Sequence, residues 1–142
     1  MPQSQTRFFG LRVPFAAHCG VEPVRMGGGQ AEFRVALDER HENSLGMAHG
    51  GLLLTLLDMA LASAARSTLP DDSTVVTVDM QSAFMAPARG VLTAQGRVAK
   101  AGRSIIFAEG EVRDAAGEIC ARATGVFRAT AKRIDKPAGG DA

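Results

Sequence analysis

Aromatic residues are scarce in this chain of 142 residues, which has no tryptophan, no tyrosine and seven phenylalanines. Few side chains are therefore available to stack on nucleic-acid bases. The net charge of only +1 also provides no basic surface for a phosphate backbone. We expect no nucleic-acid partner.

Cysteine is scarce as well, and Cys19 and Cys120 match no metal-binding or redox spacing. We expect two reduced thiols packed in the interior, and neither a metal nor another cofactor. The first 17 residues contain no apolar run of the roughly 7–15 residues that a secretory signal needs. We therefore expect a cytoplasmic protein.

Charge is nearly absent from one stretch of the chain. Between Gly46 and Ala65 the sequence reads GMAHGGLLLTLLDMALASAA, and Asp58 carries its only formal charge. The run predicts a helix from about Ala48 to Arg66 that is apolar on every side and therefore buried. It falls short of the roughly 20 apolar residues of a membrane span and holds a carboxylate near its middle, so we expect no membrane insertion.

Segments with the period-two alternation of β-strands surround this helix. One precedes it and four follow it with short turns between them, which predicts an antiparallel meander of the last four strands. Near the start we expect a short helix within 8–17, begun or interrupted at Pro14, and then a turn at the three glycines 27–29. The expected strands span residues 31–37, 73–85, 91–100, 104–114 and 118–129.

These elements predict one α+β domain, residues 1–131, in which an antiparallel β-sheet wraps around a long central helix. A partner would have to cover the part of the helix that the sheet leaves open. Small residues on the strands, such as Ala94 and Gly96, would let the helix approach the sheet closely. The segment 132–142 is polar and rich in glycine and proline, and we expect a disordered tail.

The strand expected at 73–85 has an apolar face. Alternation places Val76 and Val78 on this face and points Thr77 to the opposite one. Met80 and Phe84 would continue the apolar face. Alternation therefore puts Thr77 opposite the Val76/Val78 face, and the pattern does not settle its direction in the folded chain.

Gly50 and Gly51 occupy the first turn of the predicted helix, where backbone N–H groups have no partner within the helix. Without a Cβ, these residues let an oxygen of a ligand approach the N–H groups, and the helix dipole favours negative charge there. The pair is a candidate oxyanion hole. The alternative is that both glycines only permit close packing.

Three polar residues near this helix also allow two interpretations each. Asp58 is either a structural carboxylate hydrogen-bonded to a neighbouring strand or the centre of a site. Asn43 either contacts a ligand or closes the loop before the helix by bonding its own backbone. His49 is more typical of a helix cap or a packing residue than of a catalytic base.

The spacing of Gly50 and Asp58 constrains any shared site. Eight residues of helix separate them by about 12 Å along the axis, which one aspartate side chain cannot span. If both groups act on one reacting carbonyl, two chains must contribute through antiparallel helices. A two-fold dimer provides this arrangement and creates two equal sites.

The run H-x-N-x-x-G-x-x-H-G-G followed by L-x-D, from His41 to Asp58, resembles the signature of hotdog-fold acyl-CoA thioesterases. The match is to the PaaI-like branch, named after phenylacetic acid degradation. The segments 78–80 and 85–87 and the turn 100–103 extend the resemblance over nearly the whole chain. The histidine–acid loop of related hydratases is absent, so we expect no dehydratase activity.

The resemblance implies hydrolysis of an acyl-CoA, with an aryl or medium-chain acyl group, to the free acid and CoA. It implies a homodimer that pairs into a homotetramer. The alternative is a non-hydrolytic acyl-CoA-binding protein of the same fold. Met59, Met80 and Phe84 could line the acyl pocket or belong to the core.

The resemblance also assigns catalytic roles residue by residue. Asp58 matches the carboxylate that acts as general base or as nucleophile. Gly50 matches the backbone donor to the thioester carbonyl, and Asn43 matches the side chain that places the carbonyl or the water. Thr77 matches a serine or threonine that orients the water.

Four further residues are expected to bind substrate. His49 and Gly51 lie at the start of the helix, beside the candidate oxyanion hole. Lys100 and Arg103 lie in a turn that often meets the phosphates of CoA in this family, although exposed cations on a turn are commonly only solvated.

Overall fold

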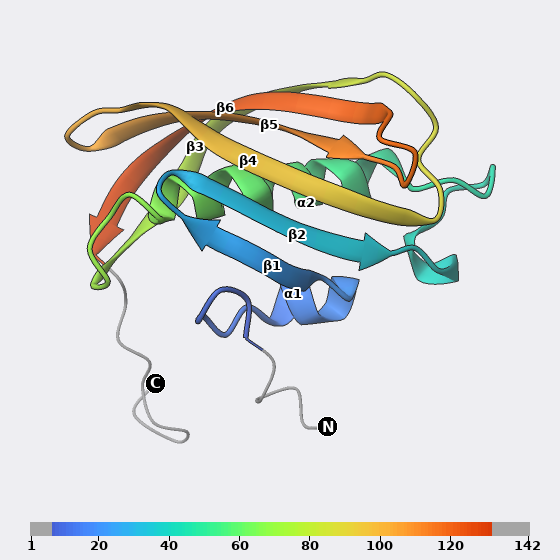
Figure 1. The fold of residues 1–142 in the computed structure, drawn as a ribbon, viewed down its shortest axis with the longest axis horizontal. Helices are drawn as coiled ribbons and strands as arrows, with labels where there is room; N and C mark the ends of the chain where they lie inside the picture. Colours follow the sequence, from blue (N-terminus) through green and yellow to red (C-terminus); the bar gives the residue numbers. More distant parts are fainter. Residues whose placement is uncertain (1–6, 132–142) are drawn as a thin grey trace.

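The computed structural model describes residues 7–131, in which a six-stranded antiparallel sheet holds the long helix α2, Gly50–Arg66 (Figure 1). The expected tail at 132–142 lies outside the described residues. The other elements are α1 Pro14–Cys19, β1 Glu22–Gly27, β2 Gln30–Ala36, η2 Glu39–His41, β3 Ser73–Phe84, β4 Val91–Ala101, β5 Ile105–Arg113 and β6 Ile119–Ala131.

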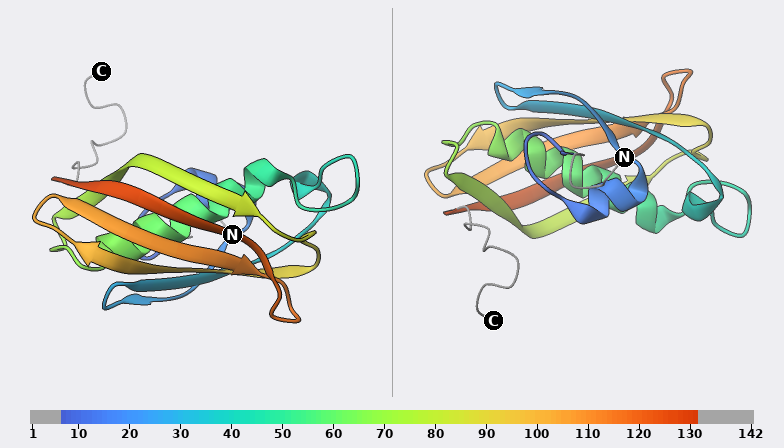
Figure 2. Two further views of the ribbon diagram at one scale, coloured as in Figure 1. Left: turned by 90° about the horizontal axis from the view of Figure 1, so that it is seen from above. Right: turned by 90° about the horizontal axis from the view of Figure 1, so that it is seen from below.

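The strands follow the order β1-β2-β4-β5-β6-β3, and every neighbouring pair is antiparallel. Seen along two further directions, the sheet curves around α2 (Figure 2). This confirms the expected α+β architecture of an antiparallel sheet wrapped around one long helix.

The expected meander is wrong at one point, because β3 pairs with β6 and not with β4. The connection 85–90 does not join β3 and β4 as a hairpin, because its backbone is hydrogen-bonded to other segments of the chain. The N–H groups of Met85 and Ala86 donate to the carbonyl of Cys120 at 2.7 and 3.2 Å, and the Ala88 carbonyl accepts from Ala48 N–H at 2.9 Å. The chain thus crosses past the start of α2 and enters the sheet between β2 and β5.

Strand β1 was not expected from the sequence. It is an edge strand whose side chains are almost all exposed, so no alternation of apolar and polar residues marks it. The three glycines form the expected turn, which closes the β1–β2 hairpin with positive φ angles at Gly28 and Gly29. Helix α1 begins at Pro14, as the proline indicated, and ends at Cys19.

The close approach of helix and sheet depends on small residues, as expected. A Cβ at Gly96 on β4 would collide with the carbonyl of Ala60 on α2. A Cβ at Gly125 on β6 would lie 3.2 Å from Leu61, and Ala94 and Ala121 are fully buried beside the helix. The sheet can therefore pack onto the backbone of α2.

Within this single chain the sheet does not cover helix α2 on every side, and the open part is the one that we expected a partner to cover. Gly51 is exposed, Leu54 is 37% exposed, and Asp58 and Ala62 are half-buried. These residues form one stripe along the helix that six strands cannot cover, because the sheet curls around the opposite face. The expectation that something else must cover part of α2 applies to this stripe.

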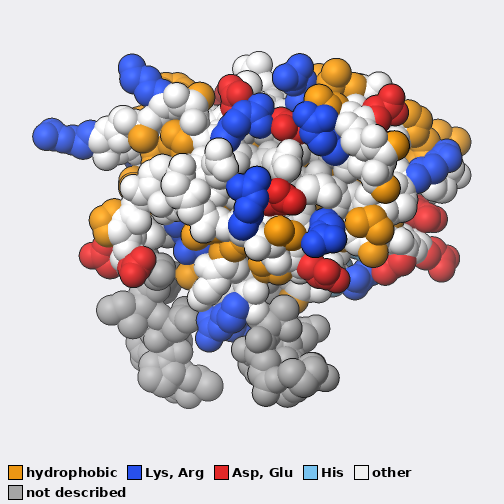
Figure 3. Space-filling view, in the orientation of Figure 1, with side chains coloured by type: hydrophobic (Ala, Val, Ile, Leu, Met, Phe, Trp, Pro, Cys, Tyr) orange, Lys and Arg blue, Asp and Glu red, His pale blue; other side chains and the backbone are white. Residues whose placement is uncertain are grey.

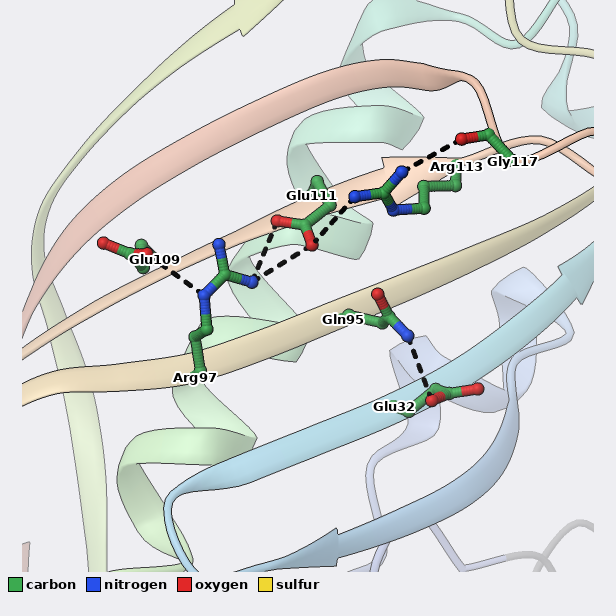
Figure 4. A network of polar contacts seen from close by, with 7 residues as sticks. All are labelled: Glu32, Gln95, Arg97, Glu109, Glu111, Arg113 and Gly117. Carbon is green, nitrogen blue, oxygen red and sulfur yellow. Dashed lines mark hydrogen bonds and ion pairs between the residues drawn. The ribbon is translucent and has the colours of Figure 1, made fainter.

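The face of the sheet away from α2 carries a network of charges (Figure 4). Arg97 donates to Glu109 and, through both carboxylate oxygens, to Glu111, each at 3.0 Å. Partial burial lowers the pKa of Arg97, but the hydrogen bonds and charges of these two carboxylates outweigh it and raise the pKa. On the side drawn in Figure 3, basic and acidic side chains are interspersed.

Candidate active site

The start of α2 is capped by a histidine. His49 is the N-cap residue, and its Nδ1 accepts a hydrogen bond from the N–H of Gly51 at 2.8 Å. This places His49 in the capping role that its position suggested, and it occupies the N–H of Gly51. Gly50 makes no such bond to the cap.

Gly50 lines a cavity of about 370 Å³ at the start of α2. Its walls are mainly apolar and come from the helix and from the connection after β3, with Leu53, Phe84 and Met85 among them. A Cβ added at Gly50 would meet the Phe84 ring at 3.7 Å, an ordinary contact distance. Packing therefore does not require glycine at position 50. Access of a ligand oxygen to the N–H of this residue would be a reason for glycine there.

Asn43 closes the loop before the helix through its side-chain oxygen. Oδ1 accepts from the N–H groups of Leu45 at 2.8 Å and Met47 at 3.2 Å. This is the structural interpretation of Asn43, but it uses only the carbonyl half of the amide. Among residues 7–131 no hydrogen bond engages its NH₂ group, which can still donate to a ligand.

Asp58 accepts a hydrogen bond from Thr77 on β3. The Thr77 hydroxyl lies 2.7 Å from Oδ1 of Asp58, so one carboxylate oxygen is held in place and the other is left for further contacts. A residue on the strand and a residue on the open stripe of α2 are thereby joined.

Thr77 lies opposite Val76 and Val78, as alternation indicated, but a β-bulge between Thr77 and Asp79 changes which residues share a face with Met80. The extra residue shifts the alternation by one position. Before the bulge Val75 and Thr77 face α2, and after it Met80 does. Val76 and Val78 consequently lie outward, 45% and 58% exposed, instead of forming the buried face.

The candidate residues form two groups within one chain. Gly50, His49 and Asn43 gather at the start of α2, and Asp58 lies with Thr77 about 12 Å farther along its axis. No single carbonyl can contact Gly50 and Asp58 of the same chain.

Lys100 and Arg103 lie at the opposite end of α2 from Gly50. Both are exposed in the β4–β5 hairpin, and neither takes part in an ion pair among residues 7–131. Gly29 connects this end of β4 to the end of α2, because its N–H donates to the Ser67 hydroxyl at 2.8 Å and its carbonyl accepts from Val98 N–H at 2.8 Å. The hairpin is therefore remote from the oxyanion-hole candidate of its own chain (Figure 1).

A second cavity adjoins Asp58, and sequence reasoning missed Arg66 among its lining residues. It has a volume of about 150 Å³ and is lined by Asp58, Met59 and Arg66 on α2 and by residues of the N-terminal segment. The spacing of positions 58, 62 and 66 on one helix face is the signal that could have revealed Arg66.

The remaining chemistry of the described part is limited. Cys19 and Cys120 are buried and unpaired, as expected, and burial raises the pKa of both thiols. Within residues 7–131 no three His, Cys, Asp or Glu side chains gather as metal ligands. No helix in that part is long and apolar enough to span a membrane.

Comparison with known proteins identifies the family. The sequence profile described as Thioesterase superfamily matches residues 45–121, which include the start of α2, Asp58 and Thr77. The chain belongs to the thioesterase superfamily. Its six-stranded sheet around one helix is the hotdog fold of that family, as the resemblance implied.

Curated relatives of this thioesterase-superfamily chain carry esterase names. A candidate esterase of Pseudomonas aeruginosa is 39% identical over 69% of this chain, and one of Halobacterium salinarum is 34% identical over 63%. Mouse acyl-coenzyme A thioesterase 13 is 36% identical over 51% of the chain. The matches span 75%, 63% and 52% of these relatives' own lengths.

Solved structures share the fold. A Bacillus halodurans protein solved with CoA is 29% identical, with a TM-score of 0.75 over 83% of this chain and 76% of that one. The PaaI protein of the E. coli phenylacetic acid degradation operon has a TM-score of 0.79 over 87% of this chain and 88% of its own. At 22% identity, PaaI shows a common fold.

Proposed function

We propose that this protein hydrolyses acyl-CoA thioesters to the free acid and CoA. Membership of the thioesterase superfamily, the name of the mouse relative and the CoA in the Bacillus halodurans structure support this substrate class. The observation that carries the proposal is the Asp58 carboxylate, held by Thr77 at 2.7 Å on the stripe of α2 that the sheet leaves open.

In the proposed mechanism, the N–H of Gly50 donates to the thioester carbonyl at the positive end of the α2 dipole. The Asn43 amide donates to the same oxygen or to the attacking water. Asp58 takes a proton from that water, or attacks the carbonyl carbon itself and is freed by water in a second step. In the first route the C–S bond breaks and the thiolate of CoA takes up the proton that Asp58 removed from the water. In the second route the thiolate leaves as Asp58 forms an anhydride with the acyl group, and the water that hydrolyses this anhydride supplies the proton.

We further propose that each site combines two protomers. Antiparallel packing of two α2 helices along their open stripes would bring Gly50 of one protomer to Asp58 of its partner, which one chain cannot do. Strand β3 is one edge of the sheet, and its exposed Phe84, which lies beside Gly50, would be covered as well. Such dimers would pair into a homotetramer.

The same arrangement gives Lys100 and Arg103 a place in substrate binding. Because their hairpin lies near the end of α2, it would approach the start of the partner's helix in an antiparallel dimer. The two cations could then meet the phosphates of a CoA whose thioester lies on the partner's Gly50.

The test is hydrolysis of a panel of aryl- and fatty-acyl-CoAs, followed by release of the CoA thiol. Asp58→Asn keeps an acceptor for Thr77 and should lower kcat by about 10²-fold or more, the effect of losing a positioned base. Asp72→Asn, on an exposed turn, is the matched control and should be unchanged. A wild type that binds acyl-CoAs and never turns them over would instead support the non-hydrolytic binding protein.

A further inference from the structure

His41 is a buried titratable residue that the proposed mechanism does not use. It is the last residue of η2 and is 4% exposed, with both ring nitrogens engaged. Nδ1 accepts a hydrogen bond from the N–H of Asp38 at 3.0 Å, so the proton of the neutral ring lies on Nε2. Nε2 donates to the carbonyl of Cys19, at the end of α1, at 2.7 Å. The ring therefore connects two segments that are 22 positions apart in the sequence.

The loop 42–48 is closed at its base by the backbone of His41. The His41 carbonyl accepts from the N–H of His49 at 2.8 Å. Inside the loop, the backbone and the side chain of Asn43 make several hydrogen bonds to other loop residues. The loop is thus braced internally, and it presents the free amide NH₂ of Asn43 beside the start of α2.

Two attachments hold this braced loop on the rest of the domain. The N–H of Ala48 donates to the carbonyl of Ala88 at 2.9 Å, and the His41 ring donates to the carbonyl of Cys19. Two contacts at opposite ends of the loop fix its orientation, which one contact alone would leave free to rotate. The contact through His41 is the one that a side chain makes.

The base of the loop also determines which N–H group of α2 stays free. The carbonyl of His49 accepts from Leu52 at 2.9 Å and from Leu53 at 3.2 Å, and its Nδ1 accepts from Gly51 at 2.8 Å. Of the first four N–H groups of α2, only that of Gly50 has no acceptor among residues 7–131. Because His49 is bonded to His41, the direction of the Gly50 N–H depends on the same anchor.

We propose that His41 is a positioning residue, whose ring orients the loop so that the Asn43 amide and the Gly50 N–H point at one substrate oxygen. This inference rests on the proposed function. The bond to Cys19 is the decisive one, because the bond to Asp38 lies within the local turn of η2. Donors that stabilise a developing charge act through exact placement, so a small rotation of the loop would slow the reaction.

The test uses three substitutions that separate the two ring contacts. His41→Gln places an N–H near the position of Nε2 and can keep the bond to Cys19, His41→Asn places an oxygen near Nδ1 and can keep the bond to Asp38, and His41→Phe keeps neither. With the best substrate of the acyl-CoA panel, His41→Phe and His41→Asn should lower kcat by about 10-fold or more, with KM within a few-fold. His41→Gln should stay within a few-fold of wild type in both. Arg97→Met, which removes hydrogen bonds on the outer face of the sheet, is the matched control and should leave kcat of the folded protein unchanged.

Amide hydrogen exchange, measured by NMR, gives a second measurement that needs no substrate. The N–H groups of His49 and Gly51 should exchange about 10-fold faster or more in His41→Phe and His41→Asn, and at nearly the wild-type rate in His41→Gln. The N–H of Leu57, in the buried middle of α2, should be unchanged in all three and shows that the fold is intact.

Equal kcat in wild type and His41→Phe would overturn the inference. Equal losses in His41→Gln and His41→Asn would overturn it too, because the bond to Cys19 would then not be decisive. A loss in Arg97→Met as large as in His41→Phe would show an effect of stability alone and would also overturn it. A wild type that hydrolyses no acyl-CoA would refute the proposed function, and exchange would then decide: faster exchange in His41→Phe but not in His41→Gln supports the anchor, and unchanged exchange overturns it. If His41→Phe does not fold, His41→Gln and His41→Asn decide in the same way.

Discussion

A site shared between protomers predicts that two inactive variants restore activity in each other. Asn43→Asp keeps an oxygen that accepts from Leu45 and Met47, and it removes the amide donor. Asp58→Asn keeps an acceptor for Thr77 and removes the carboxylate. Both substitutions therefore preserve the local hydrogen bonds of the fold, and each should inactivate every site of its own homo-oligomer.

The expected recovery follows from the separation of about 12 Å along α2 between Asp58 and Gly50, which lies at the same end of the helix as Asn43. Each site takes its Asn43 from one protomer and its Asp58 from the other. When equal amounts of the variants are unfolded and refolded together, a site receives both intact residues with a probability of about one in four. Activity per chain should then rise to about a quarter of the wild-type value.

The assay is release of the CoA thiol, before and after mixed refolding, with each variant refolded alone as the control. Mixing without unfolding should restore activity only as fast as protomers exchange. Activity that stays at the level of the separate variants after refolding, while refolded wild type is fully active, would refute the shared site. Full activity from a stable monomer would refute it too.

Three further predictions concern stability. Gly96→Ala should lower the free energy of unfolding, measured in urea, by about 1–3 kcal/mol or more, because the new Cβ meets the backbone of α2. Gly27→Ala is the control, and it should leave the free energy of unfolding nearly unchanged because the space around Gly27 is open. Arg97→Met should lower the free energy of unfolding by about 1–3 kcal/mol in the same measurement, because Glu111 is 5% exposed and loses the Nη1 group that donates to both of its oxygens. Burial raises the pKa of Cys120 above its ordinary 9.0, so the folded state favours the neutral thiol, and stability should fall as the pH rises above about 9. A Cys120→Ala variant whose stability falls just as steeply over that pH range would contradict this cause.

Much of the fold could be predicted from periodicity alone, for identifiable reasons. The apolar run containing Asp58 marks α2 because a buried helix leaves a long uncharged segment. The strands β2, β4, β5 and β6 each bury one face, so their side chains alternate. Strand β1 buries almost nothing and leaves no such pattern.

The errors arise where long-range contacts decide the local structure. The partner of β3 depends on where the connection 85–90 is anchored, and its length alone does not reveal the bonds to Cys120. The bulge at Val78 puts Met80 on the same side of the strand as Thr77, and no residue type in that segment signals it. For the site, helix geometry predicted the separation of Gly50 and Asp58, but the cavity that Asp58 and Arg66 line depends on how the N-terminal segment packs.

The pairing of β3 with β6 has a consequence for how the protein is made. Every candidate site residue precedes position 104, but within residues 7–131 β3, which carries Thr77, has only β6 as a neighbour in the sheet. The paired residues, from Ser73 with Ala131 to Phe84 with Ala121, are tens of positions apart in the sequence. Such non-local pairing closes late, so a nascent chain would hold all of its candidate catalytic groups well before the strand that aligns them could form.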